Sequence, residues 1–511
     1  MAVVMVGVCA TLASAIVGVA VGFPRLPAVH DEFSYLLAAD TYSRGRLTNP
    51  SHPMASFFET IHVLSHPTYM SKYPPVQGMT LASGQLLTGY PIVGAWLGGG
   101  LMAAAICWML QGFMPPRWAL LGGVIAALQF GIFDYWVQTY WGGSMAAVGG
   151  ALVIGAVPRI VRQPLILHSI VLGVGLIILA NSRPFEGLVF SLVPAIVLLR
   201  WVRLHWRCRN SALMRGLLPA ALVVGSGFIG MAINNTYVTG EALRLPYVEH
   251  LDQYSSTEYF LWNRSAPAIK TYVHPSLANF HVGWERDYYL QQRSLGGVLR
   301  TKGREWLDIW EFFIGWVLTV PLIVGIARLR QRRYVAPLLA LLLVCLAASV
   351  ETWCQRHYIA PTASVIVLLF MLGVRRMSLG LPRTFGAAVA MLLVVLVCVA
   401  QLAPIIVNGP NPDLATLPGR DAVIKELESM PGDHLLFVRV GPGHVPLHEW
   451  VFNGAEIDSQ QVVVARYFDI EENQRLIGYY PNRKVWVVDV NSSQNLVKLR
   501  PYPSAVVPLD P

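Results

Sequence analysis

Two carboxylates and an imidazole stand side by side directly after the first apolar segment of the chain, where residues 29–35 read VHDEFSY. Charged groups at a membrane edge are costly unless they meet water, partners or a substrate. Beside the like charge of Glu32, the carboxyl of Asp31 is expected to have a raised pKa, which suits a general base. Apolar residues follow Asp31 at helical spacing, so helix capping is an alternative that is compatible with catalysis.

Basic side chains in two short polar linkers complement these acids. Arg183 precedes Glu186 in the sequence NSRPFEG. Arg356 follows Glu351 and precedes His357 in ETWCQRHY. Because a guanidinium matches the geometry of phosphate oxygens, both arginines indicate an anionic ligand at the membrane surface. Interfacial ion pairs or snorkelling side chains are the alternative interpretation.

Two further segments hold candidate ligand contacts. Lys72 and Tyr73 precede two prolines, and Lys72 is either a third anion contact or a solvated lysine at a rigid turn. Asp134 stands near three aromatic residues, Trp136, Tyr140 and Trp141. These rings would either stack on a sugar or form the aromatic belt of a membrane protein.

The composition restricts the class of protein that carries these residues. The chain has 511 residues, of which 54% are hydrophobic and 13% charged, and its mean hydropathy is +0.50. These values are typical of a multi-span membrane protein. The net charge of +9 is therefore expected in cytoplasmic loops, and no nucleic-acid partner is expected. The six cysteines fall mostly in apolar segments and imply no disulfide framework.

Apolar runs predict about eleven transmembrane helices within residues 1–407, with boundaries uncertain by several residues. Two long polar loops interrupt them, at about 24–90 and 237–305. The predicted spans are Met1–Phe23, Pro91–Gln111, Trp118–Phe133, Gly143–Val157, Leu165–Ala180, Gly187–Leu199, Leu217–Ile233, Ile309–Ile326, Ala336–Val350, Tyr358–Val374 and Phe385–Val407.

The distribution of arginine predicts the orientation of these spans. Alternate short linkers are rich in arginine: Arg117, Arg159, Arg162, Arg200, Arg203, Arg207, Arg209, Arg215, Arg328, Arg330, Arg332, Arg333, Arg375, Arg376 and Arg383. The opposite linkers contain only Arg183 and Arg356. Since basic loops stay in the cytoplasm, the N-terminus is expected inside, and both long loops and the C-terminal segment outside.

Residues 408–511 differ in composition from the rest and predict a small extracytoplasmic α/β domain. Residues 408–412 read as a linker, residues 421–430 as a helix, and residues 434–440, 461–468 and 484–490 as strands. His444, His448 and Glu449 are spaced like metal ligands, but the neighbouring prolines favour a structural loop.

The order of these features resembles the GT-C superfamily of membrane glycosyltransferases, and most closely its protein mannosyltransferase and lipid A aminoarabinose transferase branch. The resemblance rests on a first span, an outer loop that begins with Asp31 and Glu32, and about eleven spans. It also rests on a late outer Arg356-His357-Tyr358 followed by Pro361, and on an extracytoplasmic C-terminal domain. It implies a polytopic α-helical fold of the GT-C type.

This resemblance implies sugar transfer from a polyprenyl-phosphate donor to a lipid, glycan or protein acceptor. The reaction would be inverting and would take place on the outer face of a bacterial plasma membrane. Asp31 corresponds to the general base, Glu32 to a neighbour that orients the acceptor or assists a metal, and Arg356 to a contact of the lipid phosphate. Lys72 and Arg183 are additions from their chemistry. Use of Mg²⁺ or Mn²⁺ stays open, because only Asp134 follows as a further acidic candidate.

Two other classes of protein remain as alternatives. A transporter or flippase would place ionisable groups and broken helices near the bilayer midplane. The predicted spans hold few polar groups, chiefly Gln129, His168 and Glu311, which disfavours this class. A non-enzymatic envelope protein would bind glycan through its outer domain, and Asp31→Asn would then be nearly silent.

Overall fold

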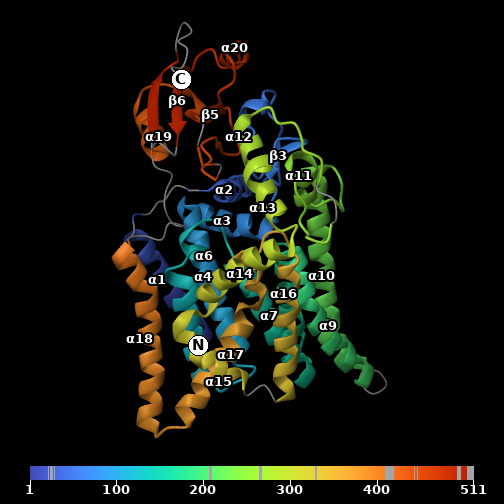
Figure 1. The fold of residues 1–511 in the computed structure, drawn as a ribbon. Helices are drawn as coiled ribbons and strands as arrows, with labels where there is room; N and C mark the ends of the chain where they lie inside the picture. The colour runs from blue at the N-terminus through green and yellow to red at the C-terminus, as the bar shows by residue number, and fades with distance from the viewer. Residues whose placement is uncertain are drawn as a thin grey trace.

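The fold places a bundle of long helices below a cap of short elements and a C-terminal sheet (Figure 1). This computed structural model describes residues 1–20, 22, 27, 29–205, 210–263, 267–327, 331–408, 419–441, 444–445, 447–491 and 496–502. Long apolar helices suit a bilayer because each one satisfies its own backbone hydrogen bonds. The polar cap gathers the two long loops and the C-terminal residues at one end of the bundle.

The bundle contains the helices that the apolar runs predict. They are α1 (Ala2–Ala20), α4 (Pro91–Leu110), α5 (Pro116–Ala126) continued by η2 (Ala127–Ile132), α7 (Ser144–Arg162), α8 (Ile166–Ala180), α9 (Pro184–His205), α10 (Asn210–Thr239), α14 (Leu295–Phe313), α15 (Gly315–Ile326), α16 (Val335–Ser349), α17 (Ala363–Leu379) and α18 (Arg383–Asn408). Within the described residues, eight helices are long and apolar enough to cross a membrane. Two more are apolar but shorter. The protein is thus a multi-pass membrane protein, and the count of eleven spans stays a prediction.

One expected span differs from the structure. Residues 309–326 read as one straight helix, but α14 and α15 meet at a bend of 87°. Gly315 has a positive φ of 56° at this bend, a conformation that glycine adopts without steric cost. The apolar run hides the bend because it continues through the break.

Burial separates central helices from peripheral ones. In the span Ala360–Leu379, 78% of the apolar window is buried, against 11% in the span Leu213–Thr239. An apolar helix that the rest of the protein leaves uncovered suits contact with lipid tails. The centre of the bundle is therefore formed by α4, α7 and α17, while α1, α10 and α18 lie at its margin.

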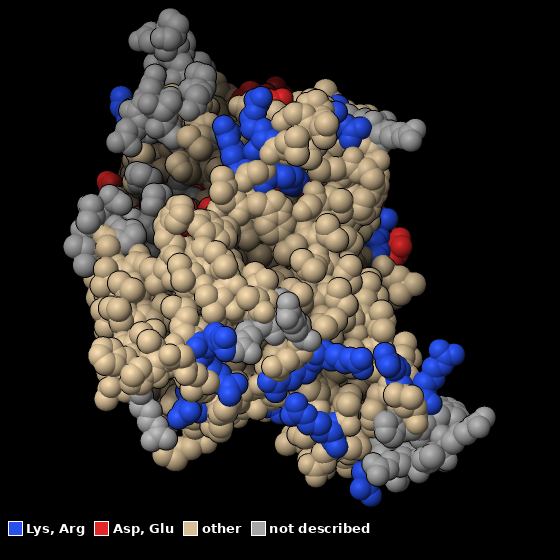
Figure 2. Space-filling view, turned by 60° about the horizontal axis from the view of Figure 1, so that its bottom comes forward, with Lys and Arg blue, Asp and Glu red and all other residues tan. Residues whose placement is uncertain are grey.

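Lys and Arg side chains crowd the end of the bundle that lies away from the C-terminal domain (Figure 2). Exposed arginines from several short linkers contribute to this face, including Arg162, Arg200, Arg332 and Arg376. The expected linker residues Arg207, Arg209, Arg328 and Arg330, and residues 409–412 of the expected interdomain linker, lie outside the described residues. That this basic face is cytoplasmic stays a prediction from the positive-inside rule.

The long loops form much of the cap. The first loop contains α2 (His30–Ser43), β1 (Asn49–Pro50), η1 (Ala55–Phe58), β2 (Val63–Leu64), β3 (Thr68–Ser71) and α3 (Pro75–Thr88). Its strands form a small antiparallel sheet in the order β1-β3-β2. The second loop contains α11 (Pro246–Tyr254), α12 (Pro275–Ala278), η3 (Asn279–Glu285) and α13 (Arg286–Gln291). Val29 is the N-cap of α2, and no side chain among the described residues caps this helix, so the structure does not give Asp31 a capping role.

The C-terminal residues form an α/β unit. It contains α19 (Arg420–Ser429), β4 (His434–Val440), β5 (Val462–Arg466), α20 (Ile470–Tyr479), β6 (Lys484–Asn491) and β7 (Leu496–Pro501), with the strand order β5-β4-β6-β7. Strands β5 and β6 run parallel to β4, and β7 is antiparallel to β6. The three expected strands and the helix at 421–430 are confirmed, whereas α20 and β7 were not predicted.

This unit packs closely on the first loop. Phe57 and Phe58 of η1 share a hydrophobic core with Leu435 and Phe437 of β4. The backbone N–H of Ala455 donates a hydrogen bond of 2.7 Å to the Asp40 carboxylate. A domain boundary at 408 stays a prediction, but the two parts share one core.

Arg466→Met is expected to loosen this packing. The Arg466 guanidinium pairs with Glu449 at 2.6 Å, and both side chains are at most 5% exposed. Arg466 also donates to Ser276 Oγ of the second loop at 2.9 Å. Since removal of one partner leaves a buried charge unpaired, the cost is about 3–5 kcal/mol. A lower melting temperature and faster proteolysis within residues 419–502 should result.

Arg475→Met is the matched control, because Arg475 pairs with Glu472 on the surface, where its side chain is 64% exposed. An exposed pair of this kind contributes at most about 1 kcal/mol. Equal melting temperatures of the two variants would contradict the structural role of Arg466.

Candidate functional site

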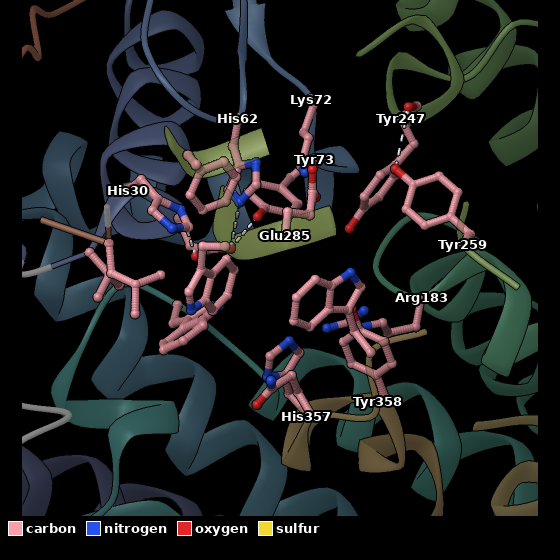
Figure 3. A pocket seen from close by; sticks show the side chains of 18 residues that line it. His30, His62, Lys72, Tyr73, Arg183, Tyr247, Tyr259, Glu285, His357 and Tyr358 are labelled. Carbon is pink, nitrogen blue, oxygen red and sulfur yellow. Dashed lines mark hydrogen bonds and ion pairs between the residues drawn. The ribbon is translucent and has the colours of Figure 1, made fainter. Parts of the chain in front are cut away.

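A cavity of about 220 Å³ lies where the two long loops meet the upper end of the bundle (Figure 3). Its lining comes from distant parts of the chain: Val29, His30, Asp31, His62, Lys72, Tyr73, Trp141, Arg183, Tyr247, Tyr259, Phe280, Trp284, Glu285, Trp353, Gln355, His357, Tyr358 and Leu447. Of the expected site residues, it brings together His30, Asp31, Lys72, Tyr73, Arg183 and His357.

Asp31 stands in the first turn of α2 with its carboxylate against three polar side chains. His30 Nδ1 lies 3.0 Å from one carboxylate oxygen, and His62 Nε2 lies 3.8 Å from the other. The hydroxyl of Tyr73 donates a hydrogen bond to Asp31. The side chain is 13% exposed, so the carboxylate is mostly enclosed but still lines the cavity.

The pKa of Asp31 shifts in the direction opposite to the sequence expectation. Burial alone would raise this pKa, but the charge and hydrogen bond of His30, the Tyr73 hydroxyl and the charge of Lys72 together lower it. The expected like charge of Glu32 is not among these influences. Glu32 instead accepts a hydrogen bond of 3.1 Å from the backbone N–H of Tyr140. Asp31 is therefore ionised near neutral pH and able to accept a proton.

Lys72 brings a buried positive charge to the same cavity. Its ammonium group lies 5.3 Å from the ring centre of Tyr73 and 5.8 Å from that of Tyr247. Within the part of the chain that the structure describes, this group makes no hydrogen bond or ion pair. Burial lowers the pKa of Lys72 to about 8, although Glu285 and Asp31 favour the charged form. A buried cation that contacts aromatic rings and makes no ion pair within the described residues is suited to receive an anion.

Arg183 brings a second buried charge from the linker between α8 and α9. Its guanidinium lies 4.0 Å from the ring centre of Tyr358 and 3.5 Å from the carboxylate of Glu186. Burial would lower its pKa, but Glu186 and the surrounding tyrosines raise it above the usual value of arginine. Arg183 therefore stays charged, and Glu186 acts as its internal counter-ion.

Prolines place both cations next to helix starts. Pro75 is at the beginning of α3 and Pro184 at the beginning of α9. Proline favours the first helical position because its missing N–H would be unpaired there in any case. Lys72 and Arg183 thus lie in the short segments just before the two helices.

The second loop and the aromatic residues complete the walls. The second loop contributes Tyr247, Tyr259, Trp284 and Glu285. Short segments between helices of the bundle contribute Trp141 and Trp353. Figure 3 shows His30 and His62 on one side of the cavity and Arg183 and Tyr358 on the other. Aromatic faces beside polar groups are suited to hold a sugar ring.

A cluster of histidines adjoins Asp31. The rings of His30 and His62 are 4.4 Å apart, His250 lies 5.7 Å from His62, and His281 lies 6.0 Å from His250. One ring nitrogen each of His62, His250 and His281 is buried without a hydrogen-bond partner among the described residues. Such orphaned nitrogens mark a place for water, an ion or substrate.

His30, Asp31 and His62 are the described residues that could hold a metal ion together, with ligand atoms within 4.8 Å of one another. Two imidazoles and one carboxylate suit Zn²⁺ or Mn²⁺ better than Mg²⁺, which prefers oxygen ligands. The expected pair of Asp31 and Glu32 does not form this group, because Glu32 faces Tyr140.

The remaining expected residues lie outside the cavity lining. Asp134 caps α6 (Tyr135–Gln138) by accepting from the N–H of Tyr135 at 2.6 Å. Arg356 makes a two-pronged ion pair with Asp308 at 2.6 and 2.7 Å, and not with Glu351 as its place in the sequence suggested.

The loop after β4 has the contacts of a structural loop. His444 Nε2 lies 2.7 Å from the carbonyl oxygen of His448. The carboxylate of Glu449 forms an ion pair with the guanidinium of Arg466. Leu447 of the same loop reaches the cavity lining.

Comparison with known proteins finds no match by sequence but finds similar folds. No protein-family model matches the chain, and no curated protein matches it. Solved structures with a similar fold include the Archaeoglobus fulgidus oligosaccharyltransferase in complex with Zn and sulfate, at 12% identity and a TM-score of 0.52. The match covers 95% of this chain and 67% of that one. ArnT from Cupriavidus metallidurans in the apo state matches at 12% identity, a TM-score of 0.50 and coverages of 95% and 93%.

These likenesses define the class of fold. The chain has the fold of the GT-C membrane glycosyltransferases, so the resemblance predicted from its motifs is confirmed at the level of the fold. Its similar structures within that class are a lipid A aminoarabinose transferase and an archaeal oligosaccharyltransferase.

Proposed function

We propose that this protein transfers a sugar from a polyprenyl-phosphate-linked donor to an acceptor hydroxyl on the outer face of the membrane. One observation carries the proposal: a single cavity holds the ionised Asp31, the two buried cations Lys72 and Arg183, and several aromatic walls. Sugar transfer from a lipid phosphate needs these three kinds of group together. The GT-C fold agrees with this arrangement.

The geometry supports a division of roles across the cavity. The donor phosphate would lie against Lys72 and Arg183, with the sugar between the aromatic walls and the acceptor hydroxyl near Asp31. The acceptor oxygen forms the new bond to the anomeric carbon as the bond from that carbon to the phosphate oxygen breaks. Asp31 accepts the hydroxyl proton, and polyprenyl phosphate leaves with both bonding electrons. Attack opposite the leaving phosphate would invert the anomeric configuration.

Supporting roles follow from the contacts. His30 and Tyr73 orient the Asp31 carboxylate, and Glu186 holds Arg183 in place. His357 Nδ1 lies 3.2 Å from the Tyr135 hydroxyl, and its side chain lines the cavity. Glu32, Asp134 and Arg356 would act from outside the lining, by shaping the segments around it. A divalent ion held by His30, Asp31 and His62 would supply positive charge beside the acceptor hydroxyl.

The proposed location of the protein is a bacterial plasma membrane. The basic face would lie in the cytoplasm of a bacterium, together with the N-terminus, and the cavity and C-terminal domain would lie outside the plasma membrane. The donor would therefore be used at the outer leaflet, at headgroup level.

The test is covalent transfer by the purified protein in vesicles that contain a labelled polyprenyl-phosphate sugar and an acceptor extract. We expect label in the acceptor and an equal amount of released polyprenyl phosphate. Movement of intact donor between leaflets without cleavage would contradict the proposal and favour a flippase. Binding of glycan by the C-terminal domain without cleavage would favour the non-enzymatic alternative.

Lys72 gives the reaction an expected alkaline limit. Its pKa of about 8 means that its charge is present below that pH and lost as the pH rises through it. Since the charged form binds the donor phosphate, kcat/KM should fall above about pH 8. Lys72→Arg keeps the charge at high pH, because arginine does not titrate in this range, and should move the fall to higher pH. An unchanged alkaline limit in Lys72→Arg would contradict this role of Lys72.

A further inference from the structure

A second cavity, of about 320 Å³, lies at the opposite end of the bundle from the proposed catalytic site. It is formed where η4 (Arg332–Tyr334) leads into α16 and where α17 ends. Its charged, aromatic and leucine lining side chains are Arg333, Tyr334, Leu372, Arg375, Arg376 and Leu379. Three guanidinium groups thus converge on one hollow of the basic face, which Figure 2 shows to be rich in Lys and Arg.

Within the described residues, the positive charge of this hollow is not balanced. Among the described residues, no carboxylate pairs with Arg333, Arg375 or Arg376. The Nε of Arg375 is buried and has no hydrogen-bond partner in the described part of the chain. Arg333 lies over the ring of Tyr334 at 4.6 Å and donates to Gln331 Oε1 at 3.0 Å. A buried guanidinium nitrogen without an acceptor, beside two exposed arginines that have no carboxylate partner among the described residues, indicates that an external anion supplies the missing acceptor.

Arg159, another arginine of the same face, makes purely structural contacts. The guanidinium of Arg159 donates to the carbonyl oxygens of Gly155 at 2.6 Å and Trp108 at 2.7 Å, and it lies over the Trp108 ring. Both of its terminal nitrogens therefore have acceptors within the protein. An arginine on the basic face can thus find its acceptors within the protein. The hollow differs from its surroundings because Arg375 has a buried nitrogen without an acceptor among the described residues.

The position of the hollow specifies the kind of anion. It lies at the ends of the two candidate spans Arg332–Ser349 and Ala360–Leu379, so it is at the level of lipid headgroups. Leu379 is 59% exposed at its rim and offers an apolar contact for an acyl chain. Basic hollows between membrane helices are suited to anionic headgroups.

We propose that this hollow binds the phosphate of an anionic phospholipid, with Arg333, Arg375 and Arg376 as its contacts. The site is separate from the proposed catalytic cavity and does not depend on sugar transfer. Guanidinium groups bind the phosphate oxygens, and Tyr334 and the leucines contact the apolar part of the lipid.

The test is the shift in melting temperature of the purified protein in uncharged detergent as short-chain phosphatidylglycerol is added. Phosphatidylcholine of the same chain length and soluble glycerol phosphate are the two comparison ligands. We expect phosphatidylglycerol to stabilise the wild type and to bind at least about tenfold more tightly than phosphatidylcholine. The variant Arg375→Gln/Arg376→Gln should lose most of this response. The matched control Arg162→Gln/Arg200→Gln removes the same charge from exposed positions of the same face and should keep it.

Three results would overturn the proposal: no stabilisation of the wild type by phosphatidylglycerol, an unchanged response in Arg375→Gln/Arg376→Gln, or an equal loss in the control variant. Equal stabilisation by glycerol phosphate would overturn the choice of a lipid and identify soluble phosphate as the ligand. If the double variant melts early without lipid, Arg333→Gln provides the measurement, because Arg333 lies on the other element and is exposed. Arg333→Gln should also weaken the response, and an undiminished one would again overturn the site.

Discussion

Asp31→Asn should lower the rate of sugar transfer by roughly 10²- to 10⁴-fold, the usual contribution of a positioned general base. Asparagine keeps the size of the side chain but cannot accept the hydroxyl proton. The contact with His30 at 3.0 Å and the hydrogen bond from Tyr73 show that the carboxylate is held in place, so its loss should affect chemistry more than shape. The measurement is the single-turnover transfer rate at saturating donor.

Glu32→Gln is the matched control for this prediction. Glu32 is the adjacent acid of α2, but it is turned toward the backbone of Tyr140, where glutamine can still accept the hydrogen bond. We expect at most about a tenfold loss of rate, because an amide oxygen replaces a charged acceptor there. If Asp31→Asn is folded and transfers at the wild-type rate, the base lies elsewhere. If Glu32→Gln loses as much as Asp31→Asn, the two acids act together and the separation of their roles is wrong.

Arg183→Gln should have the second-largest effect, a loss of about 10²- to 10³-fold in kcat, because negative charge develops on the departing phosphate. Arg183 is enclosed by Tyr358 and Glu186 and lines the cavity. In such a site no water replaces the lost charge. Glutamine retains a polar group of intermediate length, so the variant tests charge more than volume. Donor turnover and donor binding should be measured separately.

Arg356→Gln removes an arginine from the neighbouring outer segment. Its guanidinium is bound to Asp308 and does not line the cavity, so the expected loss of kcat is at most about tenfold. The double variant Arg183→Gln/Glu186→Gln should be folded at least as well as Arg183→Gln, because it leaves no buried acid unpaired. A larger loss from Arg356→Gln than from Arg183→Gln would assign the phosphate contact to Arg356.

Local patterns predicted much of this arrangement. Apolar runs identified the helices of the bundle, since a bilayer requires long uninterrupted stretches. The β-branched content of three segments located β4, β5 and β6. Asp31 and Arg183 were accessible to sequence reasoning because each is an ionisable group next to an apolar segment, and Lys72 because it stands in a polar cluster before two prolines.

Contacts between distant segments could not be predicted. Tyr247, Tyr259 and Glu285 belong to the second loop, whose sequence gives no sign that it folds over the first. His62 is one histidine among several in a polar loop, and only the fold brings it to Asp31. Likewise, Arg356 pairs with Asp308 of α14, a residue 48 positions away, and the apolar run gave no sign that this helix bends sharply into α15.

The direction of the Asp31 pKa shows the same limit. The adjacent Glu32 suggested repulsion, but successive residues of a helix point about 100° apart, and their surroundings differ accordingly. His30, Tyr73 and Lys72 determine the pKa in the folded protein, and two of these three come from a segment about forty residues away. A charge pattern read along the chain therefore identified the acid but not its environment.

Photo-crosslinking tests the central claim most directly, that the cavity beside Asp31 holds the donor phosphate. A polyprenyl phosphate with a diazirine next to the phosphate would be activated on the purified wild-type protein, and the modified peptides would be mapped by mass spectrometry. We expect adducts near Lys72, Arg183, Tyr247 and Tyr358, which line the cavity from three separate segments and the second loop. We also expect these adducts to be lost in the presence of excess unlabelled polyprenyl phosphate. Competable adducts confined to the basic face, or to the lipid-exposed surfaces of α1, α10 and α18, would contradict this claim.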